Sequence, residues 1–275
     1  MDNQRPWPRS LDVVSAQIGL SRDLVQGPGG NTSWKRDKSM WVKASGKKLA
    51  DALDSEIFCQ VSVDSPLVSI NSNNLRPSIE TTLHAVRKES FVIHTHSVGA
   101  IALGLMTTLG ASAIQLLKDS SLGIVEYVRP GISLAKKIQE VTRERKELTG
   151  VLLKNHGLVL WGEDMEVLYE KLLEFERSIN ERFPINTELL NEIRKMGISQ
   201  YLRNRHLTPD HAVFASDLNN HSSSNKDNWL LDFKYALENS LSRLGSIENL
   251  DYLNEKEVCE LQNWEMERAR KVMNT

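Results

Sequence analysis

The 275-residue sequence has little cysteine, no marked excess of either charge and no long apolar run. Its two cysteines, Cys59 and Cys259, are too few for a disulfide framework, which favours a reducing compartment. Lys and Arg number 34 against 36 Asp and Glu, so no basic field indicates a nucleic-acid or membrane partner. We find neither the roughly 18 apolar residues of a membrane span nor the apolar segment of a signal peptide. We therefore expect a soluble, cytoplasmic protein.

The sequence also lacks the glycine patterns of nucleotide-binding folds. The stretch GPGGNTSW at 27–34 fits neither G-x-x-x-x-G-K-[ST] nor G-x-G-x-x-G. Glycines beside small hydroxyl and amide residues can still form a backbone nest for an anion, and Ala44-Ser45-Gly46 and Ser78 repeat that chemistry. Ordinary turns are the commoner explanation of each stretch. A phosphate site is therefore only one of two interpretations that these residues leave open.

Apolar periodicity predicts helices and strands that interleave along most of the chain, which is typical of an α/β or α+β protein. After position 214 the composition becomes polar and rich in Asn and Ser, as in a surface loop or linker. Two amphipathic helices are expected beyond it. The predicted helices cover 9–24, 76–88, 132–143, 164–180, 229–244 and 255–273, and a further apolar helix begins near 98. The predicted strands cover 39–46, 57–63, 91–96, 123–131 and the two arms of a hairpin at 151–162.

The stretch FVIHTHSVGA at 91–100 places two histidines one residue apart on a strand that is otherwise apolar. Successive side chains of a strand point to opposite faces, so His94 and His96 project in the same direction, about 7 Å apart at their Cα atoms. That separation suits two neutral nitrogens that converge on one divalent ion. Two separately hydrogen-bonded histidines at a strand end are the alternative.

A third histidine and a glutamate complete the candidate set. His156 lies in a tight turn before Gly157, whose flexibility allows the imidazole to be aimed back at the sheet, although a simple hairpin turn explains the motif too. Glu80 opens a predicted helix, where it either complements the helix dipole or faces the metal as a general acid/base or displaceable ligand. His84, one helical turn later, is either a partner of that site or a surface residue.

Six motifs in this order carry a resemblance. They are GPGGNTSW, WVKASGKKLADA, RPSIETTLHAV, VIHTHSVGAIAL, VRPGISLAKKI and VLLKNHGLVLWG. Together they resemble the class II aldolase/adducin family, which includes L-fuculose-phosphate and L-rhamnulose-phosphate aldolases and L-ribulose-phosphate 4-epimerase. The residues of these motifs are most similar to those of the aldolase-like domain of bifunctional aldolase/dehydrogenase proteins. The similarity covers roughly residues 10–215, which divides the chain into a domain at 1–215 and a helical C-terminal extension at 216–275.

The resemblance implies a three-layer α/β/α sandwich with a mostly antiparallel central sheet, assembled as a homotetramer. It also implies that His94, His96 and His156 bind a divalent metal, with zinc the first candidate. Glu80 would then be the acid/base and resting-state ligand. A sugar or sugar-phosphate substrate would be bound by the residues that match the family's phosphate site, which are Gly30, Asn31, Ser45, Gly46 and Ser78.

Two departures from the family pattern concern the substrate. Phosphate-cleaving members often carry two serines in a row before the glutamate, and here the second position is Ile79. The tyrosine that fuculose-phosphate aldolases supply after the His-X-His helix has no match in TTLGASAIQLLK. The proton donor to the leaving aldehyde is therefore unassigned, with Tyr235 and Tyr252 of a neighbouring subunit as candidates.

The expected reaction is a metal-dependent retro-aldol cleavage of a ketose or ketose phosphate. The metal would stabilise the enediolate as a Lewis acid, so no lysine Schiff base is required. A 4-epimerase or decarboxylase could use the same centre, although the Asp/Tyr pair of the epimerases is not found here. A non-catalytic module like that of adducin is disfavoured because Glu80 and all three metal-ligating histidines are present.

Overall fold

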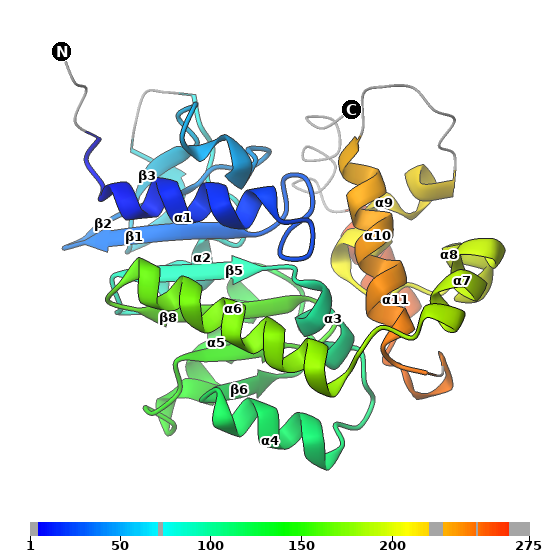
Figure 1. Cartoon of the computed structure of the whole chain (residues 1–275). Coiled ribbons are helices and arrows are strands. Elements are labelled where there is room, and N and C mark those ends of the chain that lie inside the picture. Colours follow the sequence, from blue (N-terminus) through cyan, green and yellow to red (C-terminus); the bar gives the residue numbers. More distant parts are fainter. Residues whose placement is uncertain (1–4, 71–73, 220–227, 246, 264–275) are drawn as a thin grey trace.

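A computed structural model describes residues 5–70, 74–219, 228–245 and 247–263, and an eight-stranded sheet lies at its centre (Figure 1). The order of the strands is β4-β3-β2-β1-β5-β8-β7-β6. Every neighbouring pair is antiparallel except β6 and β7, which run parallel. The strands are β1 (Asn31–Arg36), β2 (Ser39–Lys43), β3 (Phe58–Ser62), β4 (Ser65–Ser69), β5 (Phe91–Thr95), β6 (Leu122–Val125), β7 (Gly150–Leu153) and β8 (Gly157–Gly162).

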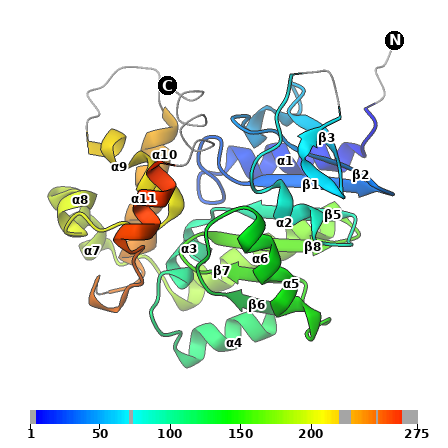
Figure 2. The same ribbon diagram turned by 180° about the vertical axis from the view of Figure 1, so that it is seen from behind.

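Helices cover both faces of the sheet, which confirms the predicted three-layer α/β/α fold (Figures 1 and 2). On one face lie α1 (Arg9–Leu20), α4 (Ala111–Asp119) and α6 (Met165–Arg182). The other face is covered by α2 (Thr81–Ala85) and α5 (Ile132–Arg143). The prediction for α2 was too long, because Pro77 instead forms a β-bridge with Ala44 and the helix begins only after Glu80.

The side-chain alternation along β5 connects the sheet to both helical layers. Phe91 and Ile93 are buried in the core beneath α1 and α6, whereas Val92 is buried with Leu83 of α2 on the opposite face. His94, two residues after Val92, therefore projects toward the face that carries α2. This places an imidazole on the same side of the sheet as the helix that begins next to Glu80.

The C-terminal helices form a separate group beside the end of the sheet where β5 passes into α3 (Val98–Gly104) (Figure 1). Ile101 and Leu105 are buried together with Ile193, Phe233 and Leu237 of this group. The helices are α7 (Thr187–Met196), α8 (Ile198–Tyr201), α9 (Pro209–Asn219), α10 (Asn228–Ser242) and α11 (Glu255–Asn263). The described residues also include the 3-10 helices η1 (Leu49–Ala52) and η2 (Ile247–Asn249).

Both predicted C-terminal helices are present as α10 and α11, and the part of the second that was expected beyond 263 lies outside the described residues. The predicted polar linker begins later than expected, since α9 continues to Asn219. Residues 220–227 of that linker lie outside the described part of the chain. Across the described ranges, no helix has the length and apolar character that a membrane crossing would need.

Candidate metal centre

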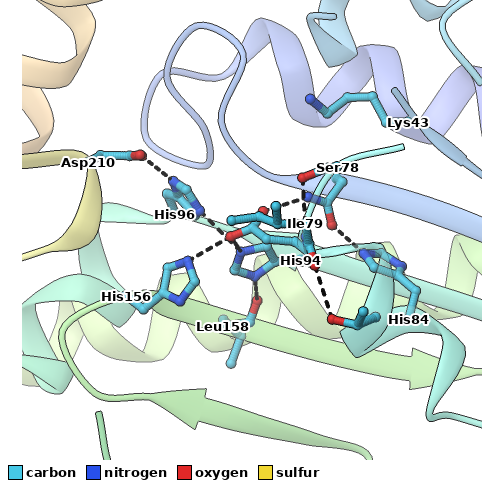
Figure 3. A network of polar contacts seen from close by, with 12 residues as sticks. Lys43, Ser78, Ile79, His84, His94, His96, His156, Leu158 and Asp210 are labelled. Carbon is cyan, nitrogen blue, oxygen red and sulfur yellow. Dashed lines mark hydrogen bonds and ion pairs between the residues drawn. The ribbon is translucent and has the colours of Figure 1, made fainter. Parts of the chain in front are cut away.

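Four predicted site residues meet at the C-terminal end of β5 (Figure 3). Glu80, His94, His96 and His156 are all buried, and each offers one ligand atom within 4.8 Å of the others. His94 belongs to β5, His96 follows it directly, and Glu80 precedes α2. The structure thus brings together the whole set that the sequence suggested for a metal.

The turn between β7 and β8 delivers His156 to this group. Asn155 adopts a left-handed conformation with φ of 57°, which starts the reversal. A Cβ atom on Gly157 would lie only 2.2 Å from the carbonyl oxygen of Thr95. Only glycine therefore permits β8 to approach the end of β5 so closely, and this close approach sets His156 beside His94 and His96.

The hydrogen bonds of two histidines fix which ring nitrogen faces the centre. His94 Nδ1 lies 3.0 Å from the carbonyl oxygen of Leu158, which can only accept, so His94 Nδ1 carries the proton. His96 Nδ1 lies 2.9 Å from a carboxylate oxygen of Asp210. Both Nε2 atoms are therefore left as acceptors.

The two Nε2 atoms of His94 and His96 are only 3.1 Å apart. Two lone pairs at this distance repel each other unless a proton or a cation lies between them. The donor set of three imidazoles and one carboxylate fits a divalent transition metal such as zinc. The donor set of the site therefore suits a metal ion.

Glu80 is the only acidic member of this set. Its Oε1 lies 3.0 Å from His156 Nε2 and 3.5 Å from His94 Nε2. Burial alone would raise the pKa of the Glu80 carboxyl, but the two histidines together hold that pKa well below its usual value. Burial lowers the pKa of His156 to about 4. At neutral pH the centre thus combines a carboxylate with a neutral imidazole, which are the protonation states that a metal requires.

A chain of hydrogen bonds supports the other oxygen of Glu80. Asn31 Nδ2 donates to Glu80 Oε2 at 2.8 Å, and the side-chain oxygen Oδ1 of Asn31 accepts from His84 Nε2. His84 Nδ1 in turn accepts from Ser33 Oγ at 2.7 Å. His84 is fully buried, and burial holds its pKa well below the usual value, so the ring is neutral. Of the two interpretations left open for His84, the partner of the site is the correct one.

The small-residue stretches that suggested an anion site lie against one another. Ser45 donates its backbone N–H to the carbonyl of Arg76 at 2.8 Å, and Ser78 Oγ accepts from the backbone N–H of Glu80 at 3.2 Å. Gly30 and Gly46 have positive φ angles of 62° and 74°, which favour glycine. Residues 44–46 therefore lie beside residues 76–78, and the latter segment leads directly to Glu80.

Lys43, which no sequence motif singled out, connects the segment at 44–47 to the glycine-rich stretch at 27–30. Its ammonium group donates to the carbonyl oxygens of Pro28 and Lys47, both at 2.7 Å, and its side chain is buried. The only signal for it is its position at the end of β2, just before Ala44-Ser45-Gly46.

Comparison with known proteins assigns the chain to a family. The family model described as class II aldolase and adducin N-terminal domain matches residues 13–182. The chain belongs to the class II aldolase and adducin family. The match includes Glu80 and all three histidines of the centre and ends with α6. The candidate metal site therefore lies entirely within the part of the chain that matches the family.

Three proteins illustrate what the chain is similar to. An uncharacterized oxidoreductase, YuxG of Bacillus subtilis, is 33% identical over 60% of this chain, which spans only 28% of the length of that protein. Methylthioribulose-1-phosphate dehydratase of Cronobacter sakazakii is 30% identical over 54% of the chain and 84% of its own length. The solved N-terminal class II aldolase domain of a conserved protein from Thermoplasma acidophilum aligns with a TM-score of 0.54 and 25% identity, covering 66% of this chain and 98% of the domain.

The two tyrosines considered as proton donors have hydrogen-bond partners within the chain. Tyr235 donates to Asp23 Oδ1 at 2.8 Å, and Tyr252 donates to the carbonyl of Ile247 at 2.8 Å. Neither phenol is paired with a residue of the metal centre by these bonds. No sequence motif pointed to Asp210, because nothing local indicates that the start of α9 reaches His96.

Proposed function

We propose that this member of the class II aldolase and adducin family is a metal-dependent lyase that cleaves a ketose or ketose phosphate by retro-aldol chemistry. One observation carries the proposal. A single buried carboxylate, that of Glu80, lies among three histidines whose nitrogens converge. In such a centre one group can hold the metal at rest and handle a proton when substrate replaces it.

We assign His94, His96 and His156 as the protein ligands of a divalent cation. Zinc is our first candidate, because three imidazoles and a carboxylate favour a transition ion over magnesium or calcium. When bound, the ion supplies Lewis-acid polarisation of the substrate carbonyl.

The roles of the remaining groups follow from their contacts. Cleavage of the C3–C4 bond of the ketose removes the proton of the C4 hydroxyl and adds one to C3, and Glu80, once protonated, supplies the proton to C3. Asn31 holds Glu80 Oε2 and so directs Oε1 toward the three histidines. Because these side chains are buried, little water competes for that proton.

We propose that a substrate phosphate or terminal hydroxyl binds to Gly30, Asn31, Ser45, Gly46 and Ser78. The contact between 44–46 and 76–78 supports this assignment, since it brings these small residues together, and the Ser78 hydroxyl lies beside the backbone of Glu80. The buried ammonium group of Lys43, which is bonded to Pro28 and Lys47, adds positive charge beneath the same loops.

Dehydration of a sugar phosphate is the second candidate. The 30% identity with a methylthioribulose-1-phosphate dehydratase, over 84% of that protein, favours it. Both reactions need a polarised carbonyl and one positioned carboxylate. They differ in the bond that breaks, which is carbon–carbon in cleavage and carbon–oxygen in dehydration.

A product screen tests both candidates. The purified chain meets a panel of ketose 1-phosphates and free ketoses with zinc and with chelator. Chelator-sensitive release of dihydroxyacetone phosphate or dihydroxyacetone supports the aldolase, whereas a product with all its carbons and one water fewer supports the dehydratase. Glu80→Gln should reduce turnover at least about 100-fold, and Glu255→Gln, a change at an exposed carboxylate of α11, should not. If the chain holds one metal ion and converts none of these compounds, the lyase proposal is contradicted.

We further propose that the chain forms a homo-oligomer, with a tetramer as the expected state. The edge strand β4 and its surroundings expose apolar side chains, with Val68 64%, Ile70 57% and Ile132 58% exposed. An open apolar edge of this kind is normally covered in a stable protein. Light scattering on the chain and on Val68→Lys tests the proposal, because a monomeric mass for both would contradict it.

A further inference from the structure

One metal-ligating side chain has a partner from far along the chain. Asp210, at the start of α9, places Oδ2 2.9 Å from Nδ1 of His96. The side chains of His96 and Asp210 are only 6% and 15% exposed, so solvent weakens this contact little. Figure 3 shows that Asp210 approaches the His96 ring on the side away from His94.

The start of α9 holds Asp210 in a fixed orientation. Thr208 Oγ1 accepts the backbone N–H of His211 at 3.1 Å, which caps the helix. His211 Nδ1 accepts the backbone N–H of Leu207 at 3.2 Å. His211 is buried, and burial lowers its pKa to about 3, so its ring stays a neutral acceptor. These hydrogen bonds therefore fix the backbone on both sides of Asp210.

The same segment is tied to the turn that carries His156. Asn155 Nδ2 donates to the carbonyls of Leu207 and Asp251, each at 2.9 Å. Lys154 forms an ion pair with Asp251 and donates to the carbonyl of Met106 at 2.9 Å. Asp210 and His156 are thus attached to one rigid support, so their positions relative to the centre are coupled.

We propose that Asp210 is the positioning residue of the metal centre and that the C-terminal region is part of that centre. Asp210 holds the proton of His96 on Nδ1 and keeps Nε2 directed at the metal. Gly29 packs against the same nitrogen, since an added Cβ atom there would lie 3.1 Å from His96 Nδ1, so the backbone at Gly29 also confines the ring. The inference rests on the metal centre proposed above.

The charge of the centre supports the same role. Three neutral imidazoles and the Glu80 carboxylate leave a divalent ion with a net charge of one unit, in a buried site. Asp210 supplies the charge that neutralises it through the His96 ring. Carboxylate partners of this kind raise the basicity of the ligand, and their loss typically weakens metal binding by about 10- to 100-fold.

Metal affinity of the full chain tests the proposal without any substrate. Zinc is titrated against a chromophoric chelator in the wild type, in Asp210→Ala and in Asp210→Asn, and the visible spectrum of the cobalt-loaded forms is recorded. We expect Asp210→Ala to raise the zinc Kd about 10- to 100-fold and to shift the cobalt bands. Asp210→Asn should lose less, because an amide oxygen still accepts the His96 proton. Glu255→Gln removes an equal charge from exposed α11 and should match the wild type.

The outcomes separate the two proposals. Wild-type zinc affinity and cobalt spectrum in both Asp210 variants would overturn the role of Asp210 and leave the metal centre intact. A wild type that binds no stoichiometric zinc would overturn the metal centre and this inference with it. If Asp210→Ala does not fold, the near-isosteric Asp210→Asn decides the question, because an unchanged Kd in a folded Asp210→Asn contradicts a role for the charge.

Discussion

A methyl group at position 157 should damage the metal centre without replacing any ligand. In Gly157→Ala the new Cβ would lie 2.2 Å from the carbonyl oxygen of Thr95 and 3.3 Å from Cα of His96. Both obstacles are backbone, so neither can rotate away. The turn that carries His156 must instead move from the end of β5, by about 1 Å to reach an ordinary contact distance.

The size of that movement sets the expected effect. A catalytic or metal site tolerates displacements of only about 0.5 Å before its geometry is lost. We therefore expect the zinc Kd of Gly157→Ala to rise at least about 10-fold, since His156 leaves the position it shares with His94 and His96. Overpacking of this kind costs about 1–3 kcal/mol of unfolding free energy in addition.

Chelator competition gives the zinc Kd, and urea unfolding of the metal-free chain gives the stability. Gly110→Ala is the matched control, because Gly110 precedes α4 with ordinary backbone angles and nothing lies within 4 Å of its added Cβ. That variant should behave as the wild type in both assays. A Gly157→Ala chain that binds zinc with wild-type affinity would show that the contact between the turn and β5 does not place His156.

Three further predictions concern pH, polar support and metal removal. Burial raises the pKa of Glu176 from 4.5 to about 7, so the native state retains a proton that the unfolded chain releases, and stability falls as pH rises from 4.5 to 7. The loss is on the order of 2–3 kcal/mol, and urea unfolding at pH 5 and pH 8 should show a smaller difference in Glu176→Gln. Asn31→Leu deprives Glu80 and His84 of their partners and should cost about 2–4 kcal/mol by the same assay; no loss would contradict the hydrogen-bond chain. Chelation should lower the melting temperature by about 5–10 °C from its value at free zinc 100-fold above Kd, and His156→Ala should abolish that difference.

Local features of the sequence predicted the parts of the fold that local physics decides. The alternation at 91–95 and the turn at 155–157 set β5 and the β7–β8 hairpin, because side-chain direction and glycine flexibility act over a few residues. The same argument placed His94 and His96 on one face. The edge strand β4 was missed because its residues, Ser65–Ser69, carry no alternating apolar pattern.

The surroundings of the ligands could not be predicted in the same way. Glu80 was compatible with two roles until the fold placed it against His94 and His156. Asp210 lies far from His96 in the sequence, and only the packing of the C-terminal helices against α3 brings the two together. Contacts of this kind depend on the whole tertiary structure, which no short pattern encodes.

The position of β5 in the sheet also bears on when the metal can be acquired. β5 pairs with β1 and with β8, and neither follows or precedes it directly in the chain. These pairings close long loops, which makes them slow steps of folding. His156 reaches His94 only after β8 has joined β5. We therefore expect the chain to fold first and load its ion afterwards, unlike small zinc modules in which the metal nucleates the structure.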